Sequence, residues 1–530
     1  MIQTKRAYGG MVVAPHHLAA EAGLAVLREG GNAIEAMIAA ASMIAVVYPH
    51  MNGLGGDNVW LIHTPGRAPV GIDACGAAAE SADITFYRSR GLDAIPSRGP
   101  LSTLTVAGAV SGWQAAFEHS QNAWRGALTL PRLLEDAIGA ARNGTPVTAS
   151  LAENTRAKSR ELQDQPGFAG AYLTDDAPPA EGARLYQNRI ADTLEVLARR
   201  GLQDFYCGDI AAALATDLES LGSPIRNVDL AGHRALLVEP LRLEVAGNQL
   251  FNMPPPTQGL ASLLMLGIYD RLGIAEAETF EYVHGLVEAA KCAFRVRDRH
   301  VGDPSYMTAE ASTLLDAALL DEMAGSIDRT TAAPWPDGGG HGDTVWLGAV
   351  DRGGRAVSFI QSIYWEFGSG VVLPQTGITW QNRGTSFSLT EGGNNSLIPR
   401  RRPFHTIQPA LAHLADGRVM PYGTMGGEGQ PQTQAMIFSR HVMHGQSLQQ
   451  AISAPRWLLG RTWGSEATNL RIENRFEQHV YDRLRAAGHD VEIVGPMEEV
   501  MGHAGALVHH PDGLIEGASD PRCDGAASGF

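Results

Sequence analysis

Residues 327–343 read IDRTTAAPWPDGGGHGD, and residues 344–365 continue as TVWLGAVDRGGRAVSFIQSIYW. The first segment combines prolines with a Gly-Gly-Gly-His-Gly run, a composition typical of a loop or linker. The second segment predicts two apolar strands that form a hairpin around Arg352-Gly353-Gly354. A linker is therefore expected to end directly before Thr344, the first residue of a core strand.

A threonine at such a junction is a candidate nucleophile. Its hydroxyl is weak by itself, but its own α-amine becomes a neighbouring base once the preceding peptide bond is cut. An α-amine has a pKa of about 7.7–8.0, so part of it is neutral near neutral pH. The β-branch also restricts the direction of the hydroxyl. An ordinary strand residue is the alternative interpretation of Thr344.

Composition excludes several classes of protein. The chain has 530 residues and a net charge of −16, and its longest basic run is Arg400-Arg401-Arg402, so neither nucleic acid nor a membrane is expected as a partner. No secretory signal is visible, and the apolar stretch 33–47 is too short to span a bilayer. Four widely separated cysteines without a CxxC pair are typical of reduced thiols, which favours a cytoplasmic location. No metal site and no cofactor are predicted, because HExxH and Cys/His clusters are absent from the sequence.

Mixed helix and strand signals favour a layered α/β protein. Asn32 and Glu35 have the spacing of a capping box at the start of a helix that stops before Pro49. The other helices are expected at residues 17–30, 257–272, 280–298 and 475–488, and a further strand at 489–494.

Residues 343–382 resemble the start of the small subunit in the γ-glutamyltranspeptidase family. Members are N-terminal-nucleophile hydrolases, made as one precursor that cuts itself before a threonine. Further matches follow in family order and extend the resemblance over almost the whole chain: NGLGGD (52–57), VAGAVSG (106–112), FYCGDIA (205–211), NMPPPTQG (252–259), GDPSY (302–306), TMGGEGQ (424–430) and GASDPRCDG (517–525).

The resemblance implies an α/β fold, a four-layer αββα sandwich built from two chains after self-cleavage between Asp343 and Thr344. Residues 1–343 would form the large subunit, ending in the Gly-rich linker, and residues 344–530 the small one, together one catalytic unit. Thr344 falls on the family's nucleophile and Ser362 on a second hydroxyl that contacts it. Gly426 and Gly427 fall on the oxyanion glycines. A homo-oligomer of the cleaved heterodimer is compatible with this picture.

The substrate-binding positions depart from the family pattern. Cys75 replaces the family's arginine that binds the glutamyl carboxylate, and Ser386 replaces the aspartate that binds the α-amine. Tyr364 replaces an asparagine, Arg383 replaces a glutamine, and His405-Thr406 replaces a serine pair. Losing the arginine and the aspartate removes the usual contacts to an amino-acid head group. Arg383 supplies a planar cation suited to a carboxylate, and His405 is expected as a second donor, charged if protonated. A structural ion pair and a core histidine are the alternatives for these two residues.

The altered positions predict a small anionic amide as substrate. Within the family, the chain is most similar to the branch that hydrolyses oxamate to oxalate and ammonia in purine-derived nitrogen salvage. Three alternatives stay open: a γ-glutamyl transpeptidase or glutathione hydrolase, a β-lactam side-chain acylase, and an uncleaved, non-catalytic binding protein. The segment EGGNNSLIPRRR at 391–402 is expected to replace the family's lid loop.

Overall fold

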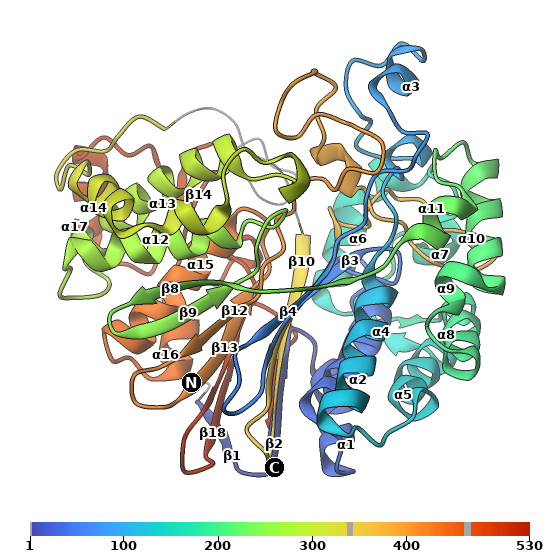
Figure 1. Ribbon diagram of the computed structural model, residues 1–530, viewed down its shortest axis with the longest axis horizontal. Helices are drawn as coiled ribbons and strands as arrows, with labels where there is room; N and C mark the ends of the chain where they lie inside the picture. Colours follow the sequence, from blue (N-terminus) through green and yellow to red (C-terminus); the bar gives the residue numbers. More distant parts are fainter. Residues whose placement is uncertain (1–2, 336–342, 461–467) are drawn as a thin grey trace.

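Two antiparallel sheets of seven strands each stack face to face, with helices on both outer faces (Figure 1). The computed structural model describes residues 3–335, 343–460 and 468–530, except for the side chain of residue 343. The arrangement is the four-layer αββα sandwich that the sequence predicts.

The first sheet has the predicted hairpin at its centre. Its strands in spatial order are β19 (Ala526–Gly529), β2 (Gly10–Ala14), β10 (Asp343–Asp351), β11 (Ala356–Tyr364), β3 (Asp57–His63), β4 (Val70–Ala74) and β7 (Leu236–Val238). The second sheet has the order β1 (Lys5–Ala7), β18 (Ile515–Ser519), β17 (Ala504–His509), β13 (Val419–Thr424), β12 (Ala410–His413), β9 (Asn248–Asn252) and β8 (Leu241–Val245).

Each sheet contains strands from both sides of residue 343. In the first sheet, β10 lies between β2 and β11, and β11 lies between β10 and β3. In the second sheet, β12 lies beside β9 and β18 lies beside β1. The N-terminal and C-terminal regions of the chain therefore form one folded unit.

Helix α2 (Ala33–Val47) packs behind the first sheet and is buried along its whole length. Its start shows the predicted capping box, because Asn32 and Glu35 bond each other's backbone N–H groups. It has no polar side that could face water, so it lies between the sheet and other helices. The remaining longer helices of this layer are α1 (His17–Arg28), α4 (Ala109–His119), α5 (Leu130–Asn143), α6 (Ala149–Leu162), α8 (Asn188–Arg200) and α10 (Asp209–Ser220).

The opposite layer covers the second sheet. It contains α12 (Gly259–Leu272), α13 (Phe280–His300), α14 (Ala317–Gly325), α15 (Gly429–Phe438), α16 (Leu448–Ser453) and α17 (Gln478–Ala486). The helices expected at 257–272, 280–298 and 475–488 correspond to α12, α13 and α17, and the strand expected at 489–494 is β16 (Val491–Val494). Among the described residues, no helix combines the length and apolar character needed to cross a membrane.

The core between the sheets is apolar and includes the fully buried Trp346 of β10 with Ile360 of β11 and Leu507 of β17. The predicted linker is partly described: residues 328–335 form neither helix nor strand, and residues 336–342 lie outside the described part. Asp343 already pairs with Tyr364 as the first residue of β10, so the linker ends one residue earlier than expected.

Candidate active site

Thr344 lies at an irregularity in the central hairpin. Asp343 pairs with Tyr364 and Val345 pairs with Gln361, so Thr344 alone faces Ser362 and Ile363 of the neighbouring strand. Such a bulge re-aims side chains and is frequent beside active sites. Here it sets the Thr344 hydroxyl against that of Ser362.

In the described part of the chain, the side chains of Ser362 and Gln430 contact the Thr344 hydroxyl. Thr344 Oγ1 donates to Ser362 Oγ at 3.3 Å, and Gln430 Nε2 donates to Thr344 Oγ1 at 3.4 Å. In this continuous chain the Thr344 nitrogen belongs to a peptide bond, and the side chain has no exposed surface. The structure thus brings together the two hydroxyls that the sequence pairs, with the Thr344 proton directed at Ser362.

Gly426 and Gly427 form the turn between β13 and α15. Their φ angles are +113° and +51°, values that favour glycine. The Gly427 carbonyl accepts from the Gln430 backbone N–H at 3.3 Å, so the turn leads directly to the side chain that contacts Thr344. The nearby N-terminus of α15 carries a partial positive charge, which favours negative charge at this place.

Arg383 is fully buried without a carboxylate partner. Its two terminal nitrogens donate to Thr406 Oγ1 at 3.3 Å, and its guanidinium lies 3.6 Å from the centre of the Tyr364 ring. Among the described residues, no carboxylate oxygen lies within 4.0 Å of its nitrogens, and Arg383 Nε has no hydrogen-bond partner. Burial lowers the pKa of Arg383 to about 10, although the nearby Tyr364, Asp57 and Cys75 each act to raise it. The structural ion pair considered from the sequence is thus absent from the described part of the chain.

Tyr364 connects Arg383 to the nucleophile. Its backbone N–H donates to Ser362 Oγ at 2.9 Å, while its ring stacks on Arg383. Its φ angle is +83°, a conformation that costs a non-glycine residue on the order of 1–3 kcal/mol. The contact with Arg383 holds the ring at the end of β11.

His405 is buried and paired with Asp57. His405 Nε2 lies 3.0 Å from Asp57 Oδ2, while Asp57 Oδ1 accepts from the backbone N–H groups of Gly76 and Gly108 at 3.0 and 2.9 Å. Burial raises the pKa of Asp57 to about 6, so the carboxylate is mostly ionised at neutral pH. Burial, with Arg383 nearby, holds the pKa of His405 well below its usual value.

The pairing with Asp57 fixes the tautomer of His405. An ionised carboxylate only accepts, so His405 Nε2–H donates to Asp57 and Nδ1 keeps its lone pair. Nδ1 has no partner among the described residues. The structure favours the core-histidine alternative, because the lowered pKa favours the uncharged ring and Nδ1 is an acceptor. Contact of His405 with a substrate stays a prediction.

Ser386 and Cys75 lie near the site without joining its hydrogen bonds. Ser386 is half-buried, and its Oγ has no partner in the described part of the chain. Cys75 is buried, and burial raises the pKa of its thiol well above the usual value. It lines a cavity of about 490 Å³ together with Asp73 and Arg402.

The arginines of the 391–402 segment are engaged with protein partners. Arg402 bonds Asp73 and, at 3.4 Å, Asp303, while Arg400 pairs with Glu80 at 2.7 Å. These contacts anchor the end of the segment against residues that precede the Asp343–Thr344 bond in the chain.

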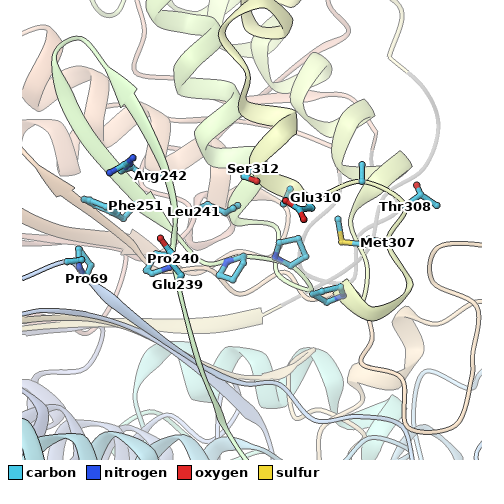
Figure 2. Close-up of a pocket in the computed structure, with 16 residues that line it drawn as sticks. Pro69, Glu239, Pro240, Leu241, Arg242, Phe251, Met307, Thr308, Glu310 and Ser312 are labelled. Carbon is cyan, nitrogen blue, oxygen red and sulfur yellow. The ribbon is translucent and has the colours of Figure 1, made fainter.

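Figure 2 shows a different cavity, of about 730 Å³, between Pro69, Pro240, Phe251 and Met307. None of the catalytic or substrate-binding candidates named from the sequence lines it. Its Pro254-Pro255 edge belongs to the NMPPPTQG motif, which continues to the active site.

One group of side chains in the described residues could hold a metal ion: His284, Glu288 and His489, with ligand atoms within 4.8 Å of one another. The Lys291 ammonium already lies 2.7 Å from the Glu288 carboxylate. The same cluster bonds the segment before residue 336, because Lys291 and Glu288 bind the carbonyl and the N–H of Ala333. These contacts hold the segment before residue 336 in place. The absence of a metal site stays a prediction.

Three further residues in the described part of the chain contact the site. None was predicted from the sequence, although each lies inside a motif that carries the resemblance. Asp57 ends NGLGGD, Gln258 lies in NMPPPTQG and Gln430 ends TMGGEGQ. Their positions in these motifs were the available signal, because nothing in their residue types alone reveals the contacts.

The chain is similar to proteins of one family over almost its whole length. The family model described as Gamma-glutamyltranspeptidase matches residues 19–530. The oxamate amidohydrolase proenzyme of Klebsiella pneumoniae is 54% identical over 521 residues, 98% of each chain. A glutathione hydrolase-like proenzyme of Bacillus subtilis is 40% identical over 523 residues, again 98% of each. The crystal structure of cephalosporin acylase from Bacillus halodurans superposes with a TM-score of 0.92 and 31% identity, covering 100% of this chain and 97% of that one.

Proposed function

Because the chain belongs to the gamma-glutamyltranspeptidase family and is an N-terminal-nucleophile amidohydrolase, we propose that it cuts itself at Asp343–Thr344 and hydrolyses a small anionic amide. Oxamate is the proposed substrate, with oxalate and ammonia as products. The proposal extends to a cytoplasmic role in purine-derived nitrogen salvage.

The observation that carries the proposal is that the Arg383 guanidinium is buried and pairs with no carboxylate of the described residues. A buried cation without a counter-ion is costly, and a bound carboxylate would offset that cost through charge-assisted hydrogen bonds. Arg383 contacts Tyr364, and Tyr364 contacts Ser362, the partner of Thr344. This short chain of contacts supports a substrate whose carboxylate and amide are close together. Oxamate has this form, with two adjacent carbons.

Self-cleavage would begin at the Thr344 hydroxyl. Its oxygen attacks the Asp343 carbonyl carbon, the C–N bond breaks, and the nitrogen takes up a proton to become the α-amine of Thr344. Water then hydrolyses the ester and releases the Asp343 carboxylate. Ser362, which accepts the Thr344 hydroxyl proton at 3.3 Å, is the proposed first proton acceptor in this step.

Turnover would use the freed α-amine as the base. The amine takes the Thr344 proton, and the oxygen attacks the amide carbon of the substrate. Backbone N–H groups at Gly426-Gly427 are the proposed donors to the oxyanion. The nitrogen leaves as ammonia with the proton from the amine, and water hydrolyses the acyl-enzyme to the second carboxylate.

The burial of the site supports an inert precursor. Thr344, Arg383 and Thr406 have no exposed surface in the continuous chain, so we expect substrate to reach them only after the cut. The two fragments, 1–343 and 344–530, would then stay together as the active unit, alone or as an oligomer of such units.

Intact mass and ammonia release test the proposal together. Wild type should give two fragments, residues 1–343 and 344–530, with masses that place the cut between Asp343 and Thr344. It should also release ammonia from oxamate. Thr344→Ala should remain one chain of 56.4 kDa without turnover. A cleaved Thr344→Ala protein, or an active one, would refute the nucleophile. A higher kcat/KM for glutathione than for oxamate would instead favour the glutathione hydrolase alternative, to which the relative from Bacillus subtilis points by its name.

A further inference from the structure

Gln258, the residue before α12, joins two separate parts of the proposed site. Its side chain is fully buried. The amide nitrogen Nε2 donates to the carbonyl of Thr406 at 2.7 Å and to the carbonyl of Gly427 at 2.7 Å. One side chain therefore bonds both the segment that contacts Arg383 and the glycine turn proposed to hold the oxyanion.

The backbone strengthens one side of this connection. The Gln258 N–H donates to the His405 carbonyl at 2.9 Å, and the His405 N–H donates to the Pro256 carbonyl at 2.9 Å. Residues 256–258 thus run alongside residues 405–406. The backbone fixes Gln258 against this segment, and the side chain extends from it to Gly427.

Arg297 of α13 fixes the orientation of the Gln258 amide. Its Nη1 donates to Gln258 Oε1 at 3.0 Å, which leaves Nε2 as the end that faces the two carbonyls. Arg297 is itself buried, with its guanidinium 4.1 Å from the Phe294 ring and its Nη2 3.6 Å from Glu428. A flipped amide would direct its NH₂ group at a guanidinium, so the observed orientation is strongly favoured.

We propose that Gln258 is a positioning residue that couples the anion-holding segment to the oxyanion turn. The inference rests on the proposed function, since it assigns Gln258 to the chemistry of Thr344. Arg383 bonds Thr406, Thr406 bonds Gln258, and Gln258 bonds Gly427. Binding of a carboxylate at Arg383 then favours the arrangement of the turn that receives the oxyanion. After the cut, Gln258 belongs to the large fragment and its two acceptors to the small one, so the coupling spans both.

Gln258→Met tests this inference, with Gln434→Met as the matched control. Gln434 of α15 is also fully buried; its Nε2 donates to the Gln408 carbonyl at 2.7 Å, and its Oε1 accepts from Ser262 at 2.9 Å. Both variants lose a buried amide of the same size, so both should lose a similar amount of thermal stability. Only Gln258→Met disturbs the bonds to Thr406 and Gly427.

Two readouts are compared on fully cut protein, verified by intact mass. With oxamate as substrate, we expect kcat of Gln258→Met to fall about 100-fold, the scale of a misplaced oxyanion donor, while Gln434→Met stays within about 3-fold of wild type. Amide hydrogen exchange should rise in peptides covering residues 403–406 and 424–430 in Gln258→Met alone.

The outcomes separate the inference from the proposed function. Equal kcat values for the two variants, with equal exchange in both peptides, would overturn the coupling. Wild type that releases no ammonia from oxamate would overturn the proposed substrate. The exchange comparison would then still decide the coupling, because it needs no substrate.

Discussion

Replacing Arg383 by methionine separates the cost of its buried charge from its benefit to catalysis. The folded-state pKa of Arg383 lies near 10, below the ordinary 12.5, so the charge disfavours folding at every pH below about 10. A shift of about 2.5 units corresponds to about 3 kcal/mol. Methionine removes this cost but also the stacking on Tyr364 and the bonds to Thr406, together about 2–3 kcal/mol. The free energy of unfolding should therefore change by no more than about 1 kcal/mol.

Activity should respond much more strongly. Two charge-assisted hydrogen bonds to a carboxylate are worth about 3 kcal/mol or more, which corresponds to at least ~150-fold in kcat/KM. Oxamide, in which a second amide replaces the carboxylate of oxamate, does not depend on this charge. Ammonia release from both compounds should therefore show the oxamate-to-oxamide ratio falling at least ~150-fold in Arg383→Met.

Arg456 provides the control. It is equally buried, and burial lowers its pKa to about 10, but it pairs with the carboxylate of Asp520. Arg456→Met removes one of two guanidinium partners of the buried Asp520, the other being Arg522, and should cost about 3 kcal/mol of stability in urea unfolding, with an unchanged oxamate-to-oxamide ratio. The reasoning is refuted if Arg383→Met is destabilised as much as Arg456→Met, or if its substrate ratio stays that of wild type.

Three further outcomes are expected. Ser362→Ala should slow self-cleavage by about 100-fold, because Ser362 is the proposed acceptor of the Thr344 proton in that step; fragments that form at the wild-type rate, followed by intact mass, would contradict this role. Burial raises the pKa of Asp57 from 3.8 to about 6, so its contribution to stability is present below about pH 4 and lost above about pH 6. Activity should depend on pH in the opposite direction, because it is the ionised Asp57 that accepts from the backbone N–H groups of Gly76 and Gly108. A plot of log kcat/KM against pH should become steeper below about pH 6 in wild type. The same plot should keep a single slope in Asp57→Asn. Asn32→Ala should cost about 1 kcal/mol in urea unfolding and leave turnover unchanged, since the cap lies in the outer helical layer.

The layered fold could be predicted from the sequence because its strongest signals are local. The capping box at Asn32 and Glu35 and the two strands around Arg352-Gly353-Gly354 depend on spacing within a few residues, and both are present. The end of the linker was misplaced by one residue because pairing of Asp343 with Tyr364 extends the strand beyond its apolar pattern.

The site was less predictable because its chemistry depends on contacts between distant residues. The pairing of Thr344 with Ser362 followed from the family resemblance, whereas the tautomer of His405 depends on Asp57, which lies 348 positions away. The position of Gln258 between two carbonyls arises only when the segments around residues 258, 406 and 427 meet. Residue type and spacing carry no information about such burial.

Because strands from both sides of residue 343 alternate in the two sheets, we expect the two fragments of the self-cleaved protein to stay paired. Removing either fragment would strip β2 from β10 and β9 from β12, and so open both sheets at their centres. The fragments therefore cannot trade partners between molecules without complete unfolding. Isotopically heavy and light enzyme, mixed after maturation, should keep their original pairs indefinitely.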